Sequence, residues 1–289
     1  MLTIIADEKE FRLYELAAAK LATSVHLWSP GVLAITDLLL LLPQSPTADL
    51  PLPDTQLLQT AGWQLCHTSI IQFAENGTSS RFLHTHMFSR LRLWQLHEYD
   101  AVLSLDIDTI VVGDLSLLFS KHLARMHRRN LTIAAAHDGL QHPCLSKPRF
   151  NAGVLLLTPN PRLFSRLTQA MHDQFDHTMA EQSLLNHVYA PHSFVPLPYA
   201  YNTQVGNALC ASNAMHDARI LHFTYPKPWS MRRSVFSCAW NDWHCLDSHM
   251  GFAWTDLGAY VHGSTHLCLL WEMLPTSVNT PVPLSLIHI

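Results

Sequence analysis

The sequence has no apolar run long enough to cross a membrane as a helix. Its longest run, residues 31–43, contains Asp37 and falls short of the roughly 20 residues that a membrane-spanning helix needs. The beginning of the chain, MLTIIAD, has neither the basic stretch nor the small-residue cleavage site of a secretory signal peptide. We therefore expect no transmembrane segment and a cytoplasmic location, with the secretory pathway as the alternative if the sequence lacks its true N-terminus.

Paired cysteines and surplus positive charge are also absent. The 6 cysteines are widely spaced without a CxxC pair, which argues against a zinc cluster and against a scaffold of dense disulfides. The 18 Lys and Arg residues face 22 Asp and Glu residues, so no excess of positive charge is available for nucleic acid or for an anionic membrane. The 20 histidines are scattered rather than gathered in a metal-storage tract. We expect no nucleic-acid partner.

What the sequence does contain is an alternation of strand-like and helix-like segments. With 289 residues, of which 48% are apolar, the chain can bury a substantial core. Strand-length apolar runs occur at residues 2–6, 38–42, 63–66, 101–105, 131–136, 154–158 and 219–223. Helical patterns or helix-start signals occur at residues 11–25, 54–61, 81–99 and 160–175. This alternation predicts an α/β fold with a mostly parallel central sheet, whose ligands bind beyond the carboxyl ends of the strands.

Two aspartates interrupt the apolar run AVLSLDIDTIVV at residues 101–112. Residues i and i+2 project from the same side of a strand, so the carboxylates of Asp106 and Asp108 emerge together. Their repulsion at about 5 Å and an effective dielectric of about 20 is on the order of 3 kcal/mol, which requires a proton or a cation between them. Carboxylate oxygens suit Mg²⁺ or Mn²⁺, and Mn²⁺ accepts imidazole more readily, so His222 at another strand end is the best third ligand. An Asp turn with a capping role and a structural histidine remain the alternatives.

Five longer blocks occur in one order within residues 2–229. They are RLRLWQLHEYDAVLSLDIDTIVVGDLSLLF (90–119), FNAGVLLLTP (150–159), AEQSLLN (180–186), LPYAYN (197–202) and HFTYPKPW (222–229). Together they resemble the glycogenin-like and galactinol synthase-like glycosyltransferases of family 8. The resemblance implies a GT-A, Rossmann-like fold that binds a nucleotide sugar. It also implies Mn²⁺-dependent retaining transfer of a hexose from a UDP-sugar, with Mg²⁺ as the alternative ion.

The resemblance assigns the metal ligands to Asp106, Asp108 and His222, with the metal bridging the two phosphates of UDP. A divalent cation takes up the charge that develops on the departing diphosphate. Lys227 would add a second positive contact to these phosphates, the alternative being a solvated loop lysine. Further donor contacts are implied at Thr3, Phe11, Arg90, Ile107, Asp138 and Gly153, of which Thr3 and Phe11 lie near the uracil and Gly153 permits a close backbone approach.

Three residues are implied to act at the transferred sugar. Glu181 and Gln182 match an acidic–Gln pair that opens a helix beside the anomeric carbon. Glu181 is the candidate for stabilising oxocarbenium-like charge or for positioning the acceptor. Asn151 matches an amide close to the sugar, with a capping Asn as the alternative. The carboxylate pair of glycosidases is a poor comparison, because a diphosphate leaving group needs no protonation.

The chain departs from the family pattern at Tyr225, where the family usually has glycine. This departure keeps open the alternative that the chain is a catalytically silent UDP-sugar-binding protein of the same fold.

A third interpretation takes LDIDT as the nucleophile motif of a haloacid-dehalogenase-type phosphatase. No tyrosine lies between Tyr201 and Tyr225, so we do not expect self-glucosylation there. The expected acceptor is a carbohydrate, a polyol or a protein. We expect a transferase domain over residues 1–229 and a C-terminal extension of unknown role over residues 230–289.

Overall fold

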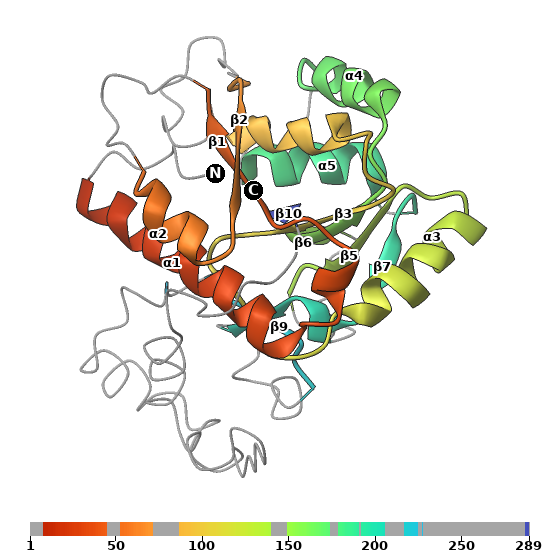
Figure 1. Ribbon diagram of the computed structural model, residues 1–289. Coiled ribbons are helices and arrows are strands. Elements are labelled where there is room, and N and C mark those ends of the chain that lie inside the picture. The colour runs from red at the N-terminus through yellow and green to blue at the C-terminus, as the bar shows by residue number, and fades with distance from the viewer. Residues whose placement is uncertain are drawn as a thin grey trace, which may run out of the picture.

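The computed structural model describes residues 8–44, 53–71, 87–139, 149–173, 179–190, 192–205, 217–224, 227 and 287–288 (Figure 1). The strands are β1 (Leu39–Pro43), β2 (Gln64–Thr68), β3 (Val102–Leu105), β4 (Thr109–Val111), β5 (Ile133–His137), β6 (Phe150–Leu157), β7 (Val195–Leu197), β8 (Thr203–Gln204), β9 (Ile220–His222) and β10 (Ile287–His288). The helices are α1 (Glu8–Trp28), α2 (Thr55–Thr60), α3 (Leu123–Arg128), α4 (Pro161–Ala170) and α5 (Ala180–Tyr189). Four shorter helices are η2 (Val32–Ala34), η4 (Met87–Gln95), η5 (Leu118–His122) and η7 (Tyr199–Tyr201).

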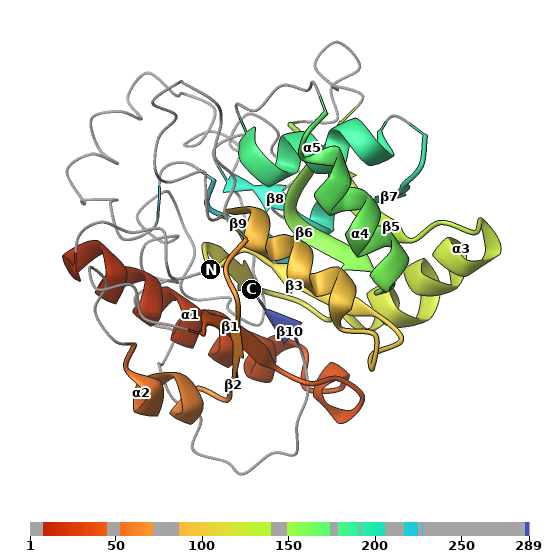
Figure 2. The same cartoon turned by 90° about the horizontal axis from the view of Figure 1, so that it is seen from above.

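The described strands form three small sheets, ordered β10-β1-β2, β3-β6-β5-β7 and β4-β9-β8. In β1 and β5, alternate residues enter opposite apolar clusters, as the pleat requires. Leu40 and Leu42 of β1 pack with α1, whereas Leu39 and Leu41 pack with η4 and α5. Accordingly, α1 and α2 cover one side of the strands, and η4, α4 and α5 cover the other (Figures 1 and 2). The predicted α/β layering is confirmed.

Strand β6 runs antiparallel to both of its neighbours, β3 and β5, whereas β5 and β7 are parallel. In this sheet β3, β5 and β7 therefore point the same way, and β6 is the reversed strand. The reversal brings the first residues of β6 to the carboxyl ends of β3 and β5. Asp106 donates its backbone N–H to Gly153 at 2.8 Å, and Asp138 donates its own to Arg149 at 3.0 Å. The residues that follow β3 and β5, Asp106 and Asp138, therefore lie beside the start of β6.

Local sequence signals explain where several elements begin. Asp54 caps α2 by accepting the Leu57 N–H, and Asn160 caps α4 by accepting the Arg162 N–H, with Pro161 in the first turn. The helix starts predicted at residues 54 and 160 are thereby confirmed. The helix over residues 8–28 also agrees with the predicted helical spacing.

The segment expected to be helical over residues 81–99 is helical over part of its described residues, but it is not an α-helix. Residues Met87–Gln95 form a 3₁₀ helix instead. Six of its residues are buried, among them Phe88, Leu91 and Trp94, against the sheet and against α4 and α5. Residues 87–95 are enclosed on several sides, so they do not present the single apolar face of an amphipathic α-helix. Their tertiary contacts therefore decide the helix type.

Two features bear on the ends of the chain. The expected strand at residues 2–6 lies outside the described residues, and β10 pairs in parallel with β1 through Leu39 opposite Ile287. Two residues of the expected C-terminal extension therefore lie beside the first sheet, and the domain boundary at residue 229 stays a prediction. No helix in the described part of the chain is sufficiently long and apolar to span a membrane.

Candidate metal and nucleotide-sugar site

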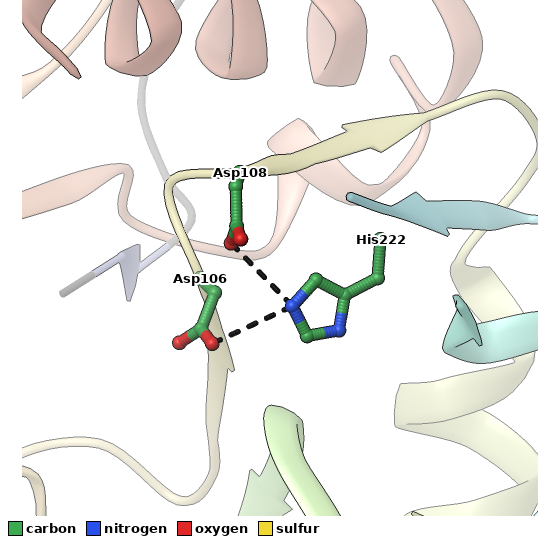
Figure 3. A group of neighbouring side chains, drawn as sticks. All are labelled: Asp106, Asp108 and His222. Carbon is green, nitrogen blue, oxygen red and sulfur yellow. Dashed lines mark ion pairs between the residues drawn. The ribbon is translucent and has the colours of Figure 1, made fainter. Parts of the chain in front are cut away.

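Asp106, Asp108 and His222 converge where the chain passes from the β3 sheet to the β4 sheet (Figure 3). Asp106 follows β3 directly, and a turn leads to β4, with Thr109 donating both its N–H and its hydroxyl to the Asp106 carbonyl. His222 ends β9 and stands opposite Thr109 in the antiparallel β4–β9 pair. The register of this pair therefore brings a histidine from far along the chain beside both aspartates.

The three side chains offer a donor set that fits a divalent cation. Nε2 of His222 lies 3.4 Å from Asp108 Oδ1 and 3.7 Å from Asp106 Oδ2, and the three ligand atoms lie within 4.8 Å of one another. Two ligands at right angles around an ion with bonds of about 2.1 Å are about 3 Å apart, so a small contraction suffices. The Asp108 and His222 side chains are buried, whereas that of Asp106 is 35% exposed. The site can thus hold an ion while opening to a ligand beside Asp106.

Lys227 supplies a positive charge to this acidic site. Its ammonium group forms an ion pair with Asp108 Oδ2. Burial alone would raise the pKa of Asp108, but His222 and Lys227 together hold that pKa below its ordinary value. Conversely, burial lowers the pKa of Lys227, and Asp108 outweighs this effect and raises it. The Lys227 ammonium group therefore places a positive charge directly beside Asp108.

Arg90 connects the aspartate pair to Glu181. Its Nη1 donates to Asp106 Oδ1 at 2.7 Å and lies 3.5 Å from Glu181 Oε1, while Nε and Nη2 donate to the Ser104 hydroxyl. Glu181 is 4% exposed, and its Oε2 has no hydrogen-bond partner among the residues that the structure describes. Burial raises the pKa of Glu181 to about 7, Arg90 opposes this rise, and Asp106 adds to it. The buried Glu181 carboxyl group is therefore linked to the candidate metal ligand Asp106 through the Arg90 guanidinium.

A second polar cluster surrounds the start of β6. The Oδ1 atom of Asn151 accepts hydrogen bonds from the Gly153 N–H at 2.9 Å and from Asn202 Nδ2 at 2.8 Å. Its Nδ2 donates to Asp138 Oδ1 at 3.4 Å. Asn202 also contacts Nδ1 of His222 at 2.8 Å. The sequence resemblance places Asn151 and Asp138 at the sugar, and the structure joins both to the histidine ligand through Asn202.

The model of the family described as glycosyl transferase family 8 matches residues 47–232, which is more than half of the chain. The chain belongs to glycosyl transferase family 8. The matched region contains all three candidate metal ligands and the blocks on which the sequence resemblance depended. That resemblance is therefore confirmed.

Solved glycosyltransferase structures share the fold of this family 8 chain. The galactosyltransferase LgtC, in complex with donor and acceptor sugar analogs, aligns with a TM-score of 0.55 at 20% identity over 80% of this chain and 90% of that chain. GlyE of Streptococcus pneumoniae aligns with a TM-score of 0.51 at 23% identity over 76% of this chain and 54% of that chain. These similarities confirm the predicted GT-A fold.

Several curated relatives in the same family match by sequence. Galactinol synthase 1 of Solanum lycopersicum is 28% identical over 49% of this chain and 48% of that protein. UDP-glucuronate:xylan alpha-glucuronosyltransferase 1 of Arabidopsis thaliana is 24% identical over 64% of this chain and 27% of that protein. Glycogenin-2 of Saccharomyces cerevisiae is 26% identical over 63% of this chain and 49% of that protein. Each match spans about half or less of the relative's length.

Gln182 and Asn186 of α5 bind the backbone of the first residues of β6. Gln182 Oε1 accepts the Ala152 N–H at 2.8 Å, and Asn186 exchanges hydrogen bonds with the backbone N–H and carbonyl of Phe150. Strand β3 pairs with β6 only from Val154 onward, and the two amides bind the β6 backbone before that residue. Ala180, just before Glu181, has a left-handed φ of 46°. Helix α5 is thereby fixed to the strand that carries Asn151, and the catalytic role of Gln182 stays a prediction.

The remaining predicted donor contacts lie in different surroundings. Phe11 is 2% exposed in the core cluster around α1, with the Arg12 guanidinium over its ring. Ile107 is also buried in that cluster. Thr3 and Tyr225 lie outside the described residues. The uracil-binding positions therefore stay predictions.

Gly153 makes room for the histidine ligand. A Cβ atom at this position would lie 2.0 Å from Cε1 and 2.6 Å from Nδ1 of His222. The sequence resemblance assigns this glycine to close approach of the donor, whereas the structure fills the space with the imidazole. Asn202, which contacts the other side of this histidine, was not among the predicted site residues. Its signal in the sequence was its position as the last residue of the LPYAYN block.

Replacing Glu181 with glutamine is expected to flatten the pH dependence of stability. Between 4.5, its ordinary pKa, and about 7, the folded protein retains a proton that the unfolded chain has released. The free energy of unfolding therefore falls as the pH rises through this window, by about 3 kcal/mol for a shift of this size. Urea unfolding of the metal-free protein at about pH 5 and about pH 7.5 measures the difference.

The matched control for this experiment is Glu98→Gln, whose side chain is 57% exposed. The control should retain the wild-type decrease in stability over the same pH range. Equal pH slopes for wild type and Glu181→Gln would show that Glu181 is not held as a buried acid.

Proposed function

We propose that this family 8 protein is a Mn²⁺-dependent retaining glycosyltransferase. It moves a hexose from a UDP-sugar to a carbohydrate, polyol or protein acceptor. The observation that carries the proposal is the convergence of two carboxylates and one imidazole at the end of β3, inside the region that matches the family. Mixed oxygen and nitrogen ligands favour Mn²⁺ over Mg²⁺, which prefers oxygen alone.

The residues around the ligands can serve a diphosphate leaving group. A bound divalent cation would supply positive charge opposite the phosphates as the bond to the sugar breaks. Asp106 faces the open side of the site, so a ligand can approach there without displacing the buried Asp108 and His222. Lys227, with 34% of its side chain exposed, can donate to a phosphate beside the ion.

Glu181 is the residue proposed to face the developing charge on the sugar. Its buried carboxyl group is oriented by Arg90, which in turn binds Asp106. Its Oε2 atom has no hydrogen-bond partner among the described residues, so it could pair with a sugar hydroxyl or a cationic centre brought beside it. An ionised carboxylate stabilises an oxocarbenium-like transition state, so binding of the donor would favour the ionised form of Glu181.

The experiment that tests this function is a screen of UDP-sugars for UDP release in the presence of Mn²⁺. UDP-glucose, UDP-galactose and UDP-glucuronate belong in the screen, because the matched relatives include glycogenin, galactinol synthase and glucuronosyltransferase proteins. We expect Mn²⁺-stimulated release with at least one donor, increased by the right acceptor. Tight binding of UDP and Mn²⁺ without release from any donor would instead indicate the silent UDP-sugar-binding protein. Absence of metal-dependent UDP binding would contradict both.

Replacing Lys227 with methionine is expected to change the two binding affinities in opposite directions. Without the competing ammonium group on Asp108, the affinity for Mn²⁺ alone should rise about threefold to tenfold. Without the second phosphate contact, the affinity for UDP in saturating Mn²⁺ should fall about tenfold. Calorimetric titrations with Mn²⁺, and then with UDP, measure both.

Lys121→Met is a suitable control, since Lys121 lies at the end of η5. It should leave both affinities unchanged. A Lys227→Met protein with both affinities unchanged would remove Lys227 from the site and leave it as a solvated lysine.

A further inference from the structure

The orientation of the buried amides near His222 follows from one backbone group. The Gly153 N–H can act only as a donor, so the atom of Asn151 that faces it must be the oxygen Oδ1. Asn202 contacts the same oxygen at 2.8 Å and must therefore present its Nδ2. This orientation turns the Asn202 oxygen toward Nδ1 of His222.

An amide oxygen can only accept, so Nδ1 of His222 must carry a proton. The lone pair of a neutral imidazole is then on Nε2, the atom that faces Asp106 and Asp108. The hydrogen bonds run in one direction, from His222 to Asn202, then to Asn151, and finally to the Asp138 carboxylate. Gln204 also donates to Asp138 at 3.2 Å.

We propose that Asn202 is a positioning residue that fixes the tautomer and the ring orientation of His222 for metal binding. Asn151 and Asp138 in turn hold Asn202. In many metal sites a single carboxylate accepts the hydrogen bond from the other ring nitrogen of the histidine ligand, and here two amides that end on a carboxylate take its place. The inference rests on the proposed metal site, and it assigns to Asn202 a role that the sequence did not indicate. It also gives Asn151 and Asp138 a function besides any contact with sugar.

The surroundings of the ring support this assignment. Asn202 is fully buried, and its Oδ1 and Nδ2 have partners on two other segments of the chain. The imidazole also fills the space above Gly153, where any side chain would collide with it. The ring is therefore held by packing on one side and by a directed hydrogen bond at Nδ1, leaving Nε2 as its ligand atom.

The first test is the protonation of His222 in the wild-type protein, measured by ¹⁵N NMR of its ring nitrogens. We expect a protonated Nδ1 in the metal-free protein at alkaline pH and in the Mg²⁺-loaded protein. A bare Nδ1, with the proton on Nε2, would overturn the proposal. This measurement needs no variant and no turnover.

The second test is the affinity for Mn²⁺ alone, measured by calorimetry on Asn202→Ala and on the matched control Asn186→Ala. Asn186 also makes hydrogen bonds that hold β6, but it does not contact the metal ligands. Loss of a partner behind a metal-bound histidine typically lowers metal affinity by about 10–100-fold, and we expect such a loss for Asn202→Ala only.

The outcomes separate this inference from the proposed function. Equal Mn²⁺ affinities for wild type and Asn202→Ala would overturn the positioning role and leave the metal site standing. Parallel losses in Asn202→Ala and Asn186→Ala would also overturn it, since both would then reflect a damaged β6. A wild-type protein that binds no Mn²⁺, yet has a protonated Nδ1, would refute the proposed metal site while the tautomer assignment stands.

Discussion

Replacing Asp108 with asparagine is expected to lower Mn²⁺-dependent UDP binding and sugar transfer by about 100-fold or more. Asp108 is the buried member of the carboxylate pair, and its two oxygens face His222 and Lys227. Asparagine has nearly the same shape but no negative charge, so the site would lose most of its attraction for a divalent cation. Circular dichroism and thermal unfolding should show that the protein remains folded, and calorimetry with Mn²⁺ and UDP measures the loss.

Asp114→Asn is a suitable control for this substitution. Asp114 also lies in a turn, where a hydrogen bond from Ser116 holds its pKa below the ordinary value, but it is exposed and outside the ligand group. The control should bind Mn²⁺ and UDP as wild type does. An Asp108→Asn protein with unchanged Mn²⁺ and UDP affinity would contradict the metal site.

Gly153→Ala is the second substitution with a large expected effect. The new Cβ would lie 2.0 Å from Cε1 of His222, so the imidazole or the backbone of β6 must move. Overpacking of this kind typically costs about 1–3 kcal/mol of stability. Displacing the histidine should also lower the affinity for Mn²⁺ by about 100-fold, because the ring would lose its position beside both carboxylates.

Gly31→Ala is the matched control. The nearest heavy atom to its added Cβ is the Ser116 hydroxyl oxygen at 4.0 Å, and Gly31 has a φ of −63°, which alanine adopts readily. Stability and Mn²⁺ affinity should therefore stay close to the wild-type values. Retention of full Mn²⁺ affinity in a folded Gly153→Ala protein would show that the position of the ring is not critical.

The candidate metal ligands could be picked out from the sequence because each has a local signal. Asp106 and Asp108 break an apolar strand with a spacing of two residues, and His222 ends another short strand. The register of the β4–β9 pair, with His222 opposite Thr109, then brings these three residues together. Asn202 had no comparable signal beyond its place at the end of the LPYAYN block. Its function depends on contacts with Asn151 and His222, which lie 51 and 20 positions away in the chain.

The direction of a strand is also not encoded in its hydrophobic pattern. The strand-like run at residues 154–158 was predicted, but its residues are buried on both faces whichever way the strand runs. Its reversal brings Asn151 and Gly153 to the carboxyl ends of β3 and β5, beside Asp106 and Asp138. The sequence therefore predicted many of the larger elements, but not short ones such as α3, β7 and β8, and the arrangement of the polar network required the three-dimensional contacts.

The most direct test of the central claim is a crystal structure of the protein with Mn²⁺ and UDP, using the anomalous scattering of manganese to locate the ion. We predict one manganese peak within about 2.3 Å of Nε2 of His222 and of a carboxylate oxygen from each of Asp106 and Asp108, in contact with the UDP phosphates. Bound UDP with the manganese elsewhere, or with Nε2 of His222 turned away from the ion, would contradict the account.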